Sequence, residues 1–266
     1  MPEGDTIFRT AESLRRWIGG RRVSAARSPR LRADLTAVVG AKVESVDARA
    51  KHLLIRFDNG RVLHTHMRMT GSWHVYPSEE RWRKPAAQAV AVLECGARLA
   101  VCFNAPVVEL LTAAGERSLP ALVRLGPDVL GSQPVEAAEL LRRAADRAHV
   151  SPTVGELLLD QQFVSGIGNI YRCETLFLCR ADPHLPTTSA AGGLLGELVA
   201  TASRLMRVNA EGSPIARRFD SAPERPWVYG RSGRPCSRCG SVVVRELLGD
   251  QGRGLYWCPG CQVRRA

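Results

Sequence analysis

Apolar residues recur every three or four positions in the first stretch of the chain, over residues 5–18. Positions at this spacing lie on one face of a helix, so the pattern predicts an amphipathic helix there. Asp5 or Thr6 can cap its start, and Gly19-Gly20 ends it. The apolar face consists of Ile7, Ala11, Leu14 and Ile18.

Short apolar segments separated by turn residues follow this helix. The pattern predicts five strands, at residues 51–58, 61–66, 73–76, 89–94 and 98–103. Asn59-Gly60 joins the first two strands and is the strongest short hairpin signal, and Cys95-Gly96-Ala97 joins the last two in the same way. Several hairpins behind one helix predict an N-terminal β-sandwich domain over residues 1–131.

Helical periodicity returns in the second half of the chain. It predicts four helices, at residues 135–148, 153–163, 170–179 and 190–208. The turn Ser165-Gly-Ile-Gly-Asn169 separates the second helix from the third, within a helical domain over residues 132–212. Residues 213–266 form a third part, which begins with a Pro- and Arg-rich loop at 213–227. The predicted fold class is therefore α+β with several domains.

Four cysteines near the C-terminus form two Cys-x2-Cys pairs separated by 18 residues. This spacing is typical of a closed tetrahedral site that holds one structural Zn²⁺, and a redox role for either pair is the weaker alternative. Segments 242–247 and 255–257 predict a β-hairpin between the pairs, with Arg253 near its tip. A zinc ion with four protein ligands would hold this hairpin and would not catalyse. The ligands are Cys236, Cys239, Cys258 and Cys261.

Positive charge is in clear excess, with 37 Lys and Arg residues against 26 Asp and Glu. Such an excess indicates a polyanionic partner, most simply nucleic acid, although an ordinary basic globular protein would share it. No apolar run approaches the roughly 18 residues of a membrane span, and the N-terminus lacks the apolar region of a signal peptide. We therefore expect a cytoplasmic protein with reduced thiols and no membrane partner.

The first residues suggest covalent chemistry. If Met1 is removed, Pro2 becomes an N-terminal secondary amine, and an α-amino group titrates near pKa ~8. Glu3 beside it can act as an acid or base, and the two together are the minimum for Schiff-base chemistry on a carbonyl or a sugar C1′. The simpler interpretation is that Pro2 only permits removal of Met1.

Three further motifs have both a structural and a functional interpretation. The glycines of the turn 165–169 suit either a plain helix–helix connection or a phosphate contact. Lys51 is either a solvated strand end or a functional cation. The loop 67–71, which contains Arg68 and Met69, either turns a corner or inserts an apolar wedge between bases.

Three histidines cluster near the second predicted strand, namely His52, His64 and His66. They could bind a metal ion, but no fourth ligand stands at a suitable spacing. The sequence therefore favours a polar network of imidazoles.

Taken together, the chain resembles the formamidopyrimidine-DNA glycosylase/endonuclease VIII family of base-excision-repair enzymes. Four anchors occur in the family's order along the whole chain. They are Met-Pro-Glu-Gly-Asp-Thr at the start, Lys51-His-Leu-Leu, Leu-Asp160-Gln-Gln-Phe-Val-Ser-Gly-Ile-Gly-Asn-Ile-Tyr171, and Val-Tyr-Gly-Arg231 before the four cysteines. The resemblance implies that the third anchor is a helix–two-turns–helix DNA-binding element and that the cysteines form a zinc finger.

The resemblance also implies a catalytic role for four residues. Pro2 would attack C1′ of the damaged nucleotide, and Glu3 would open the sugar ring and assist release of the base. Lys51 would donate a proton and contact phosphate during strand cleavage. Arg253 would hold a phosphate beside the lesion and take part in the later elimination. The implied activity is that of a bifunctional DNA glycosylase and AP lyase.

Further residues match DNA-contacting positions of the family. Asn169 would hold a phosphate, Arg124 would contact DNA, and Met69, next to Arg68, would fill the gap left by the flipped base. The expected partner is damaged DNA, bound by a monomer. A non-catalytic DNA-binding zinc protein is the alternative, because it would need only the charge, the helical turn and the finger.

Departures from the family pattern favour the endonuclease VIII branch. The start reads Pro-Glu-Gly-Asp-Thr where the formamidopyrimidine branch has Pro-Glu-Leu-Pro-Glu, so Asp5 replaces a Glu. The strand that ends Cys-Phe-Asn-Ala-Pro106 lacks that branch's Arg-Arg-Phe wedge. Arg68-Met69-Thr70 also differs from the Gln-Leu-Tyr wedge of the best-known endonuclease VIII. By analogy we expect oxidised pyrimidines as the main substrates.

Overall fold

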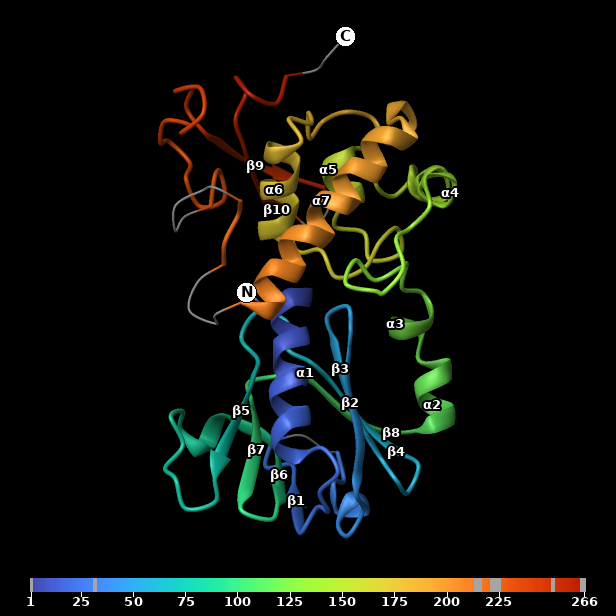
Figure 1. Ribbon diagram of the computed structural model, residues 1–266, viewed down its shortest axis with the longest axis vertical. Helices are drawn as coiled ribbons and strands as arrows, with labels where there is room; N and C mark the ends of the chain where they lie inside the picture. Colours follow the sequence, from blue (N-terminus) through green and yellow to red (C-terminus); the bar gives the residue numbers. More distant parts are fainter. Residues whose placement is uncertain (1, 31–32, 213–216, 221–225, 250–251, 264–266) are drawn as a thin grey trace. The chain divides into compact units, whose positions relative to one another are not determined.

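The computed structural model describes residues 2–30, 33–212, 217–220, 226–249 and 252–263 (Figure 1). The chain forms two compact units, Met1–Val123 and Arg124–Ala266. The predicted domain boundaries at residues 131 and 212 stay predictions. Much of the loop 213–227 lies outside the described residues, which include only 217–220 and 226–227 of it.

The first unit is a β-sandwich with a leading helix, as expected. Helix α1 spans Gly4–Ile18 and buries the four apolar residues that its periodicity singles out. One sheet has the strand order β1-β6-β7-β5 and the other β2-β3-β4-β8. The strands are β1 (Ala25–Arg27), β2 (Val43–Arg49), β3 (His52–Phe57), β4 (Arg61–His66), β5 (Ser72–Pro77), β6 (Ala89–Cys95), β7 (Arg98–Phe103) and β8 (Val107–Thr112).

The core of this unit lies where α1 and the inward faces of both sheets meet. Leu53, Ile55 and Leu63 of one sheet pack in one apolar cluster with Leu93 and Cys102 of the other. Because side chains alternate along a strand, the residues between them point to the opposite face. Four short helices complete the unit, namely η1 (Thr36–Val38), η2 (Ala86–Gln88), α2 (Ala113–Ser118) and α3 (Pro120–Val123).

The second unit is helical and ends in the predicted hairpin. Its helices are α4 (Ala137–Arg147), α5 (Val154–Leu157), α6 (Asn169–Leu178), η3 (Thr187–Ser189) and α7 (Gly192–Glu211). Strands β9 (Val244–Leu248) and β10 (Arg253–Trp257) pair antiparallel. Figure 1 shows α6 and α7 side by side in this unit, and apolar residues of both helices share its core.

The prediction of a helix over 153–163 is wrong beyond its first turn. Thr153 and Glu156 form a capping box that starts α5, but the helix ends at Leu157. The Asp160 carboxylate then accepts the Gln162 N–H at 2.9 Å, and the Asp160 carbonyl accepts the Phe163 N–H at 3.0 Å. These local bonds replace the helical ladder with turns that lead into Ser165–Asn169.

Buried polar groups fix the segment that enters the finger. The Glu174 carboxylate, fully buried in α6, accepts the N–H groups of Trp227, Val228 and Tyr229 at 2.6, 3.0 and 2.9 Å. Burial raises the pKa of Glu174, while these three hydrogen bonds favour its charged form. Within the part of the chain that the structure describes, no helix has the length and apolar character needed to cross a bilayer.

Candidate functional site

The proposed nucleophile stands immediately before the first helix. Pro2 is half-buried, and Glu3 is the N-cap residue of α1, whose carbonyl accepts the N–H groups of Thr6 and Ile7 at 2.9 and 3.1 Å. The Glu3 side chain is fully buried, as is that of Asp5. A helix N-terminus favours negative charge, whereas full burial favours the neutral carboxylic acid, so the two effects oppose each other at both side chains. Met1 lies outside the described residues.

Lys51 occupies the tight turn between β2 and β3. Arg49 and His52 pair across this turn, and Ala50 has the left-handed φ of 56°. Helix α1 packs against β2, the strand that ends two residues before Lys51. The structure therefore places the lysine on a turn of the same unit as Pro2 and Glu3.

The three histidines form a polar network, as expected. His52 Nδ1 lies 2.8 Å from His64 Nε2, and His64 Nδ1 lies 2.9 Å from a carboxylate oxygen of Glu109. The ring of His66 meets that of His52 edge-on at 4.7 Å. Burial and nearby cations, Lys51 among them, lower the pKa of His52 to about 3 and that of His66 to about 4. Both imidazoles are therefore neutral at pH 7.

The loop between β4 and β5 presents an apolar side chain to solvent. Met69 is 58% exposed, and Arg68 has a φ of 45°. The hydroxyl of Thr70 donates to the Asn104 carbonyl at 3.2 Å, which ties this loop to the connection between β7 and β8. An exposed methionine on a braced loop is compatible with the wedge role, which stays a prediction.

In the second unit, the first residue of α6 contacts the finger hairpin. The side-chain amide of Asn169 donates to the Gly254 carbonyl at 2.7 Å, and Arg172 Nη2 donates to the Arg253 carbonyl at 3.4 Å. Gly254 directly follows the exposed Arg253, so Asn169 contacts the backbone one residue after this arginine. Arg124 is exposed at the start of this unit.

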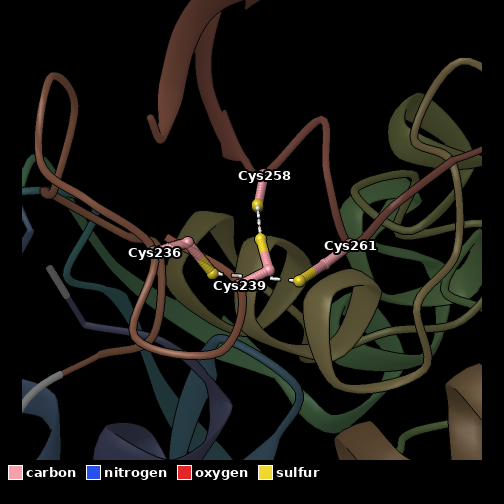
Figure 2. A group of neighbouring side chains, drawn as sticks. All are labelled: Cys236, Cys239, Cys258 and Cys261. Carbon is pink, nitrogen blue, oxygen red and sulfur yellow. Dashed lines mark hydrogen bonds between the residues drawn. The ribbon is translucent and has the colours of Figure 1, made fainter. Parts of the chain in front are cut away.

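The four cysteines converge, as Figure 2 shows. Their sulfur atoms all lie within 4.8 Å of one another, and the Cys236–Cys261 and Cys239–Cys258 pairs are 3.8 and 3.4 Å apart. Zinc–sulfur bonds of about 2.3 Å in a tetrahedron put sulfurs about 3.8 Å apart, so the cluster can hold a metal ion of that kind. It is the one such group of His, Cys, Asp or Glu among the described residues.

Comparisons with known proteins agree with this arrangement. Residues 1–106 match the model of the formamidopyrimidine-DNA glycosylase N-terminal domain, and residues 125–218 match its H2TH domain. The chain belongs to the formamidopyrimidine-DNA glycosylase family. The predicted membership is confirmed.

Curated relatives of this glycosylase family place the chain near its endonuclease 8 members. A probable endonuclease 8 2 of Streptomyces coelicolor is 38% identical, over 99% of this chain and 94% of the relative. The DNA-(apurinic or apyrimidinic site) lyase Nei2 of Mycolicibacterium smegmatis is 34% identical over 99% of both chains. Endonuclease 8 of Escherichia coli is 30% identical over 98% of this chain and all of the relative.

Solved structures of the glycosylase family share the fold. The MutM (Fpg) protein of Thermus thermophilus superposes with a TM-score of 0.80 at 28% identity, over 98% of each chain. A Lactococcus lactis formamidopyrimidine-DNA glycosylase, bound to DNA containing an AP site, gives 0.81 at 19% identity, over 99% of this chain and 100% of that one. The predicted architecture of sandwich, helical H2TH domain and cysteine hairpin is confirmed.

Sequence reasoning missed two structural features of this glycosylase-family site. Arg172 is fully buried in α6, where it also donates to the Gly155 carbonyl at 3.5 Å. The available signal was an arginine within a predicted helix that is mostly apolar, since burying a cation without a partner is costly. The second feature is Glu109, whose partner His64 lies 45 residues away, so no local pattern could indicate it.

Proposed function

We propose that Pro2 attacks C1′ of an oxidised nucleotide and thereby links excision of the base to cleavage of the strand. The chain is a DNA glycosylase and AP lyase of base-excision repair, as its endonuclease 8 relatives indicate. The observation that carries the mechanism is Pro2 immediately before α1, next to a buried Glu3. A relative named as a lyase does not favour the alternative of a non-catalytic DNA-binding protein.

Glycosylase and lyase steps share one covalent intermediate. The Pro2 nitrogen forms a bond to C1′ as the bond from C1′ to the base breaks, and Glu3 supplies the proton that opens the sugar ring. The resulting iminium acidifies C2′. Loss of a C2′ proton then breaks the bond from C3′ to the 3′ phosphate, and a second elimination releases the 5′ phosphate. Water hydrolyses the imine and frees Pro2.

Cationic and polar groups hold the DNA during these steps. Lys51 contacts phosphate and donates a proton, while Asn169 and Arg253 hold phosphates that flank the lesion. One of the two N–H groups of the Asn169 amide remains for phosphate, because the other donates to Gly254. Arg124 makes a further contact with DNA. Met69 fills the space of the flipped base, beside Arg68.

The same proposal includes the substrate, the oligomeric state, the location and the metal. Oxidised pyrimidines in DNA are the main substrates, and the protein acts as a monomer at the nucleoid in the cytoplasm. One Zn²⁺ bound by Cys236, Cys239, Cys258 and Cys261 holds the hairpin that carries Arg253. With four thiolate ligands, this zinc is structural.

Borohydride trapping tests the role of Pro2 directly. Reduction in the presence of DNA with an oxidised pyrimidine or an abasic site should give a stable protein–DNA adduct. Pro2→Gly, or an N-terminal tag that acylates Pro2, should weaken or abolish it. Pro235→Gly, which alters a proline of the second unit, is the control and should leave trapping intact. Absence of an adduct with every such substrate would exclude the proposal.

A further inference from the structure

An imidazole chain beside Lys51 has no part in the mechanism described so far. In the β2-β3-β4-β8 sheet, His52 pairs with His66, Leu54 with His64, and His64 with Glu109. Because side chains alternate, His52, His64, His66 and Glu109 share one face. Leu53, Ile55 and Leu63 occupy the other face, in the sandwich core. The register of three strands therefore assembles a polar chain on the face away from that core.

The Glu109 carboxylate, at one end of this series of hydrogen bonds, determines which ring nitrogens of His64 and His52 carry a hydrogen. A carboxylate oxygen only accepts, so a His64 imidazole with a single ring hydrogen carries it on Nδ1, 2.9 Å from that carboxylate. His64 Nε2 is then an acceptor and takes a hydrogen from His52 Nδ1 at 2.8 Å. The remaining ring nitrogen of neutral His52, Nε2, is left with a lone pair. One carboxylate thus determines that His52 presents an acceptor.

The neighbouring ring presents a donor for a similar reason. His66 Nδ1 accepts the backbone N–H of Arg68 at 3.1 Å, so neutral His66 carries its hydrogen on Nε2. His52 and His66 therefore present opposite hydrogen-bonding groups from rings 4.7 Å apart. Lys51 directly precedes His52 in the turn that the Arg49–His52 pair closes, so its side chain starts one residue before this pair of rings.

A metal site does not explain the cluster. The three histidine rings do not bring their nitrogens within the common distance that the four cysteine sulfurs satisfy, in the part of the chain that the structure describes. The direct contact between His52 Nδ1 and His64 Nε2 also uses two of the nitrogens that a metal would need. A chain of hydrogen bonds that ends next to a lysine is the arrangement to be explained.

We propose that Glu109, His64 and His52 form a positioning relay, in which the Nε2 lone pair of His52 accepts a hydrogen from the Lys51 ammonium. The relay holds the lysine head group toward the phosphate and sugar that it serves during strand cleavage. A lysine side chain has several rotatable bonds, so a fixed acceptor limits the positions that its ammonium samples. This inference rests on the proposed role of Lys51.

Substitutions at His64 separate the polar contact from packing. His64 is 2% exposed, so His64→Leu fills its volume without an acceptor, whereas His64→Gln keeps an acceptor for His52. With DNA that contains a preformed abasic site, His64→Leu should lower the single-turnover cleavage rate about tenfold, a fraction of what a positioned acid contributes. His64→Gln should restore most of that rate. Affinity for the DNA should change less than about twofold in both.

Glu109→Gln tests the relay at a position that tolerates change. Its side chain is 46% exposed, and Gln keeps an acceptor but loses the charge that fixes the protons. We expect a cleavage rate about three- to tenfold lower at unchanged melting temperature. Glu94→Gln, which neutralises a carboxylate paired with Arg27 on the other sheet, is the matched control and should cleave like the unaltered protein.

Two outcomes would overturn the relay. Either His64→Leu and Glu109→Gln cleave abasic DNA at the unaltered rate, or His64→Gln is as slow as His64→Leu while both remain folded. Lys51→Ala distinguishes a failure of the relay from a failure of the proposed function. If Lys51→Ala cleaves normally, the proposed role of Lys51 fails, whereas normal relay variants beside a slow Lys51→Ala refute the relay alone.

Discussion

The side-chain amide of Asn169 donates to the carbonyl of Gly254 across 2.7 Å, which joins the first residue of α6 to β10. Gly254 directly follows Arg253, and Arg172 Nη2 contacts the Arg253 carbonyl from the same helix. The position of Arg253 is therefore set by hydrogen bonds to its backbone from α6. These two hydrogen bonds support the proposal that Asn169 and Arg253 contact neighbouring phosphates.

Asn169→Ala should weaken binding to abasic DNA about tenfold or more. It removes one hydrogen bond to β10, worth about 1 kcal/mol, together with the proposed phosphate contact. The salt dependence of binding should stay nearly unchanged, since no charge is lost. Arg253→Ala should instead reduce the slope of log binding constant against log salt concentration by about one. Fluorescence anisotropy over a range of salt concentrations distinguishes the two, and equal salt slopes would contradict the assignment to Arg253.

Removal of the metal should loosen the finger. We expect one Zn²⁺ per chain by elemental analysis, and Cys258→Ser should lose it and lower both stability and DNA affinity. Cys179→Ala, which alters a half-buried thiol outside the cluster, should keep its zinc. Full zinc content in Cys258→Ser would contradict the four-cysteine ligand set.

Stability should fall in mild acid because two imidazoles are held neutral. The pKa of His52 is lowered to about 3 and that of His66 to about 4, from 6.5 in an unfolded chain. Below pH 6.5 the unfolded chain binds protons that the folded chain does not, so this stabilisation is complete above pH 6.5 and decreases toward pH 4. Each histidine contributes at most about 1.4 kcal/mol per pH unit.

Urea unfolding between about pH 4.5 and 7.5 checks this dependence. The double variant His52→Gln and His66→Gln should show a shallower loss of unfolding free energy than the unaltered protein. His149→Gln, at an exposed position, is the control and should retain the full slope. An unchanged slope in the double variant would mean that other groups cause the acid sensitivity.

Met69→Ala should impair base excision without affecting stability. Its side chain is 58% exposed, so truncation should change the free energy of unfolding by less than about 0.5 kcal/mol. Excision of an oxidised pyrimidine from duplex DNA should slow, because nothing then fills the space of the flipped base. Cleavage of single-stranded abasic DNA should be unaffected. Val123→Ala, equally exposed, is the control, and equal excision rates for the two variants would refute the wedge role.

The sequence by itself determined the elements whose causes are local. The apolar spacing of residues 5–18 produced α1, Asn59-Gly60 produced the β3–β4 hairpin, and the paired cysteines indicated their cluster. In each case a residue acts on neighbours a few positions away, or a ligand pair repeats a known spacing. The order of four motifs along the chain was enough to identify the family.

Tertiary structure decided what depends on distant partners. The predicted helix over 153–163 stopped at Leu157, and Arg147 of α4 binds the Asp160 carboxylate in the turns that follow, at 2.7 Å. Arg172 became a buried anchor for β10 only because the finger packs on α6. The hydrogen bonds that connect Glu109, His64 and His52 exist because the strand register aligns β3, β4 and β8. Such contacts join residues far apart in sequence, and only the packed fold sets the distances between them.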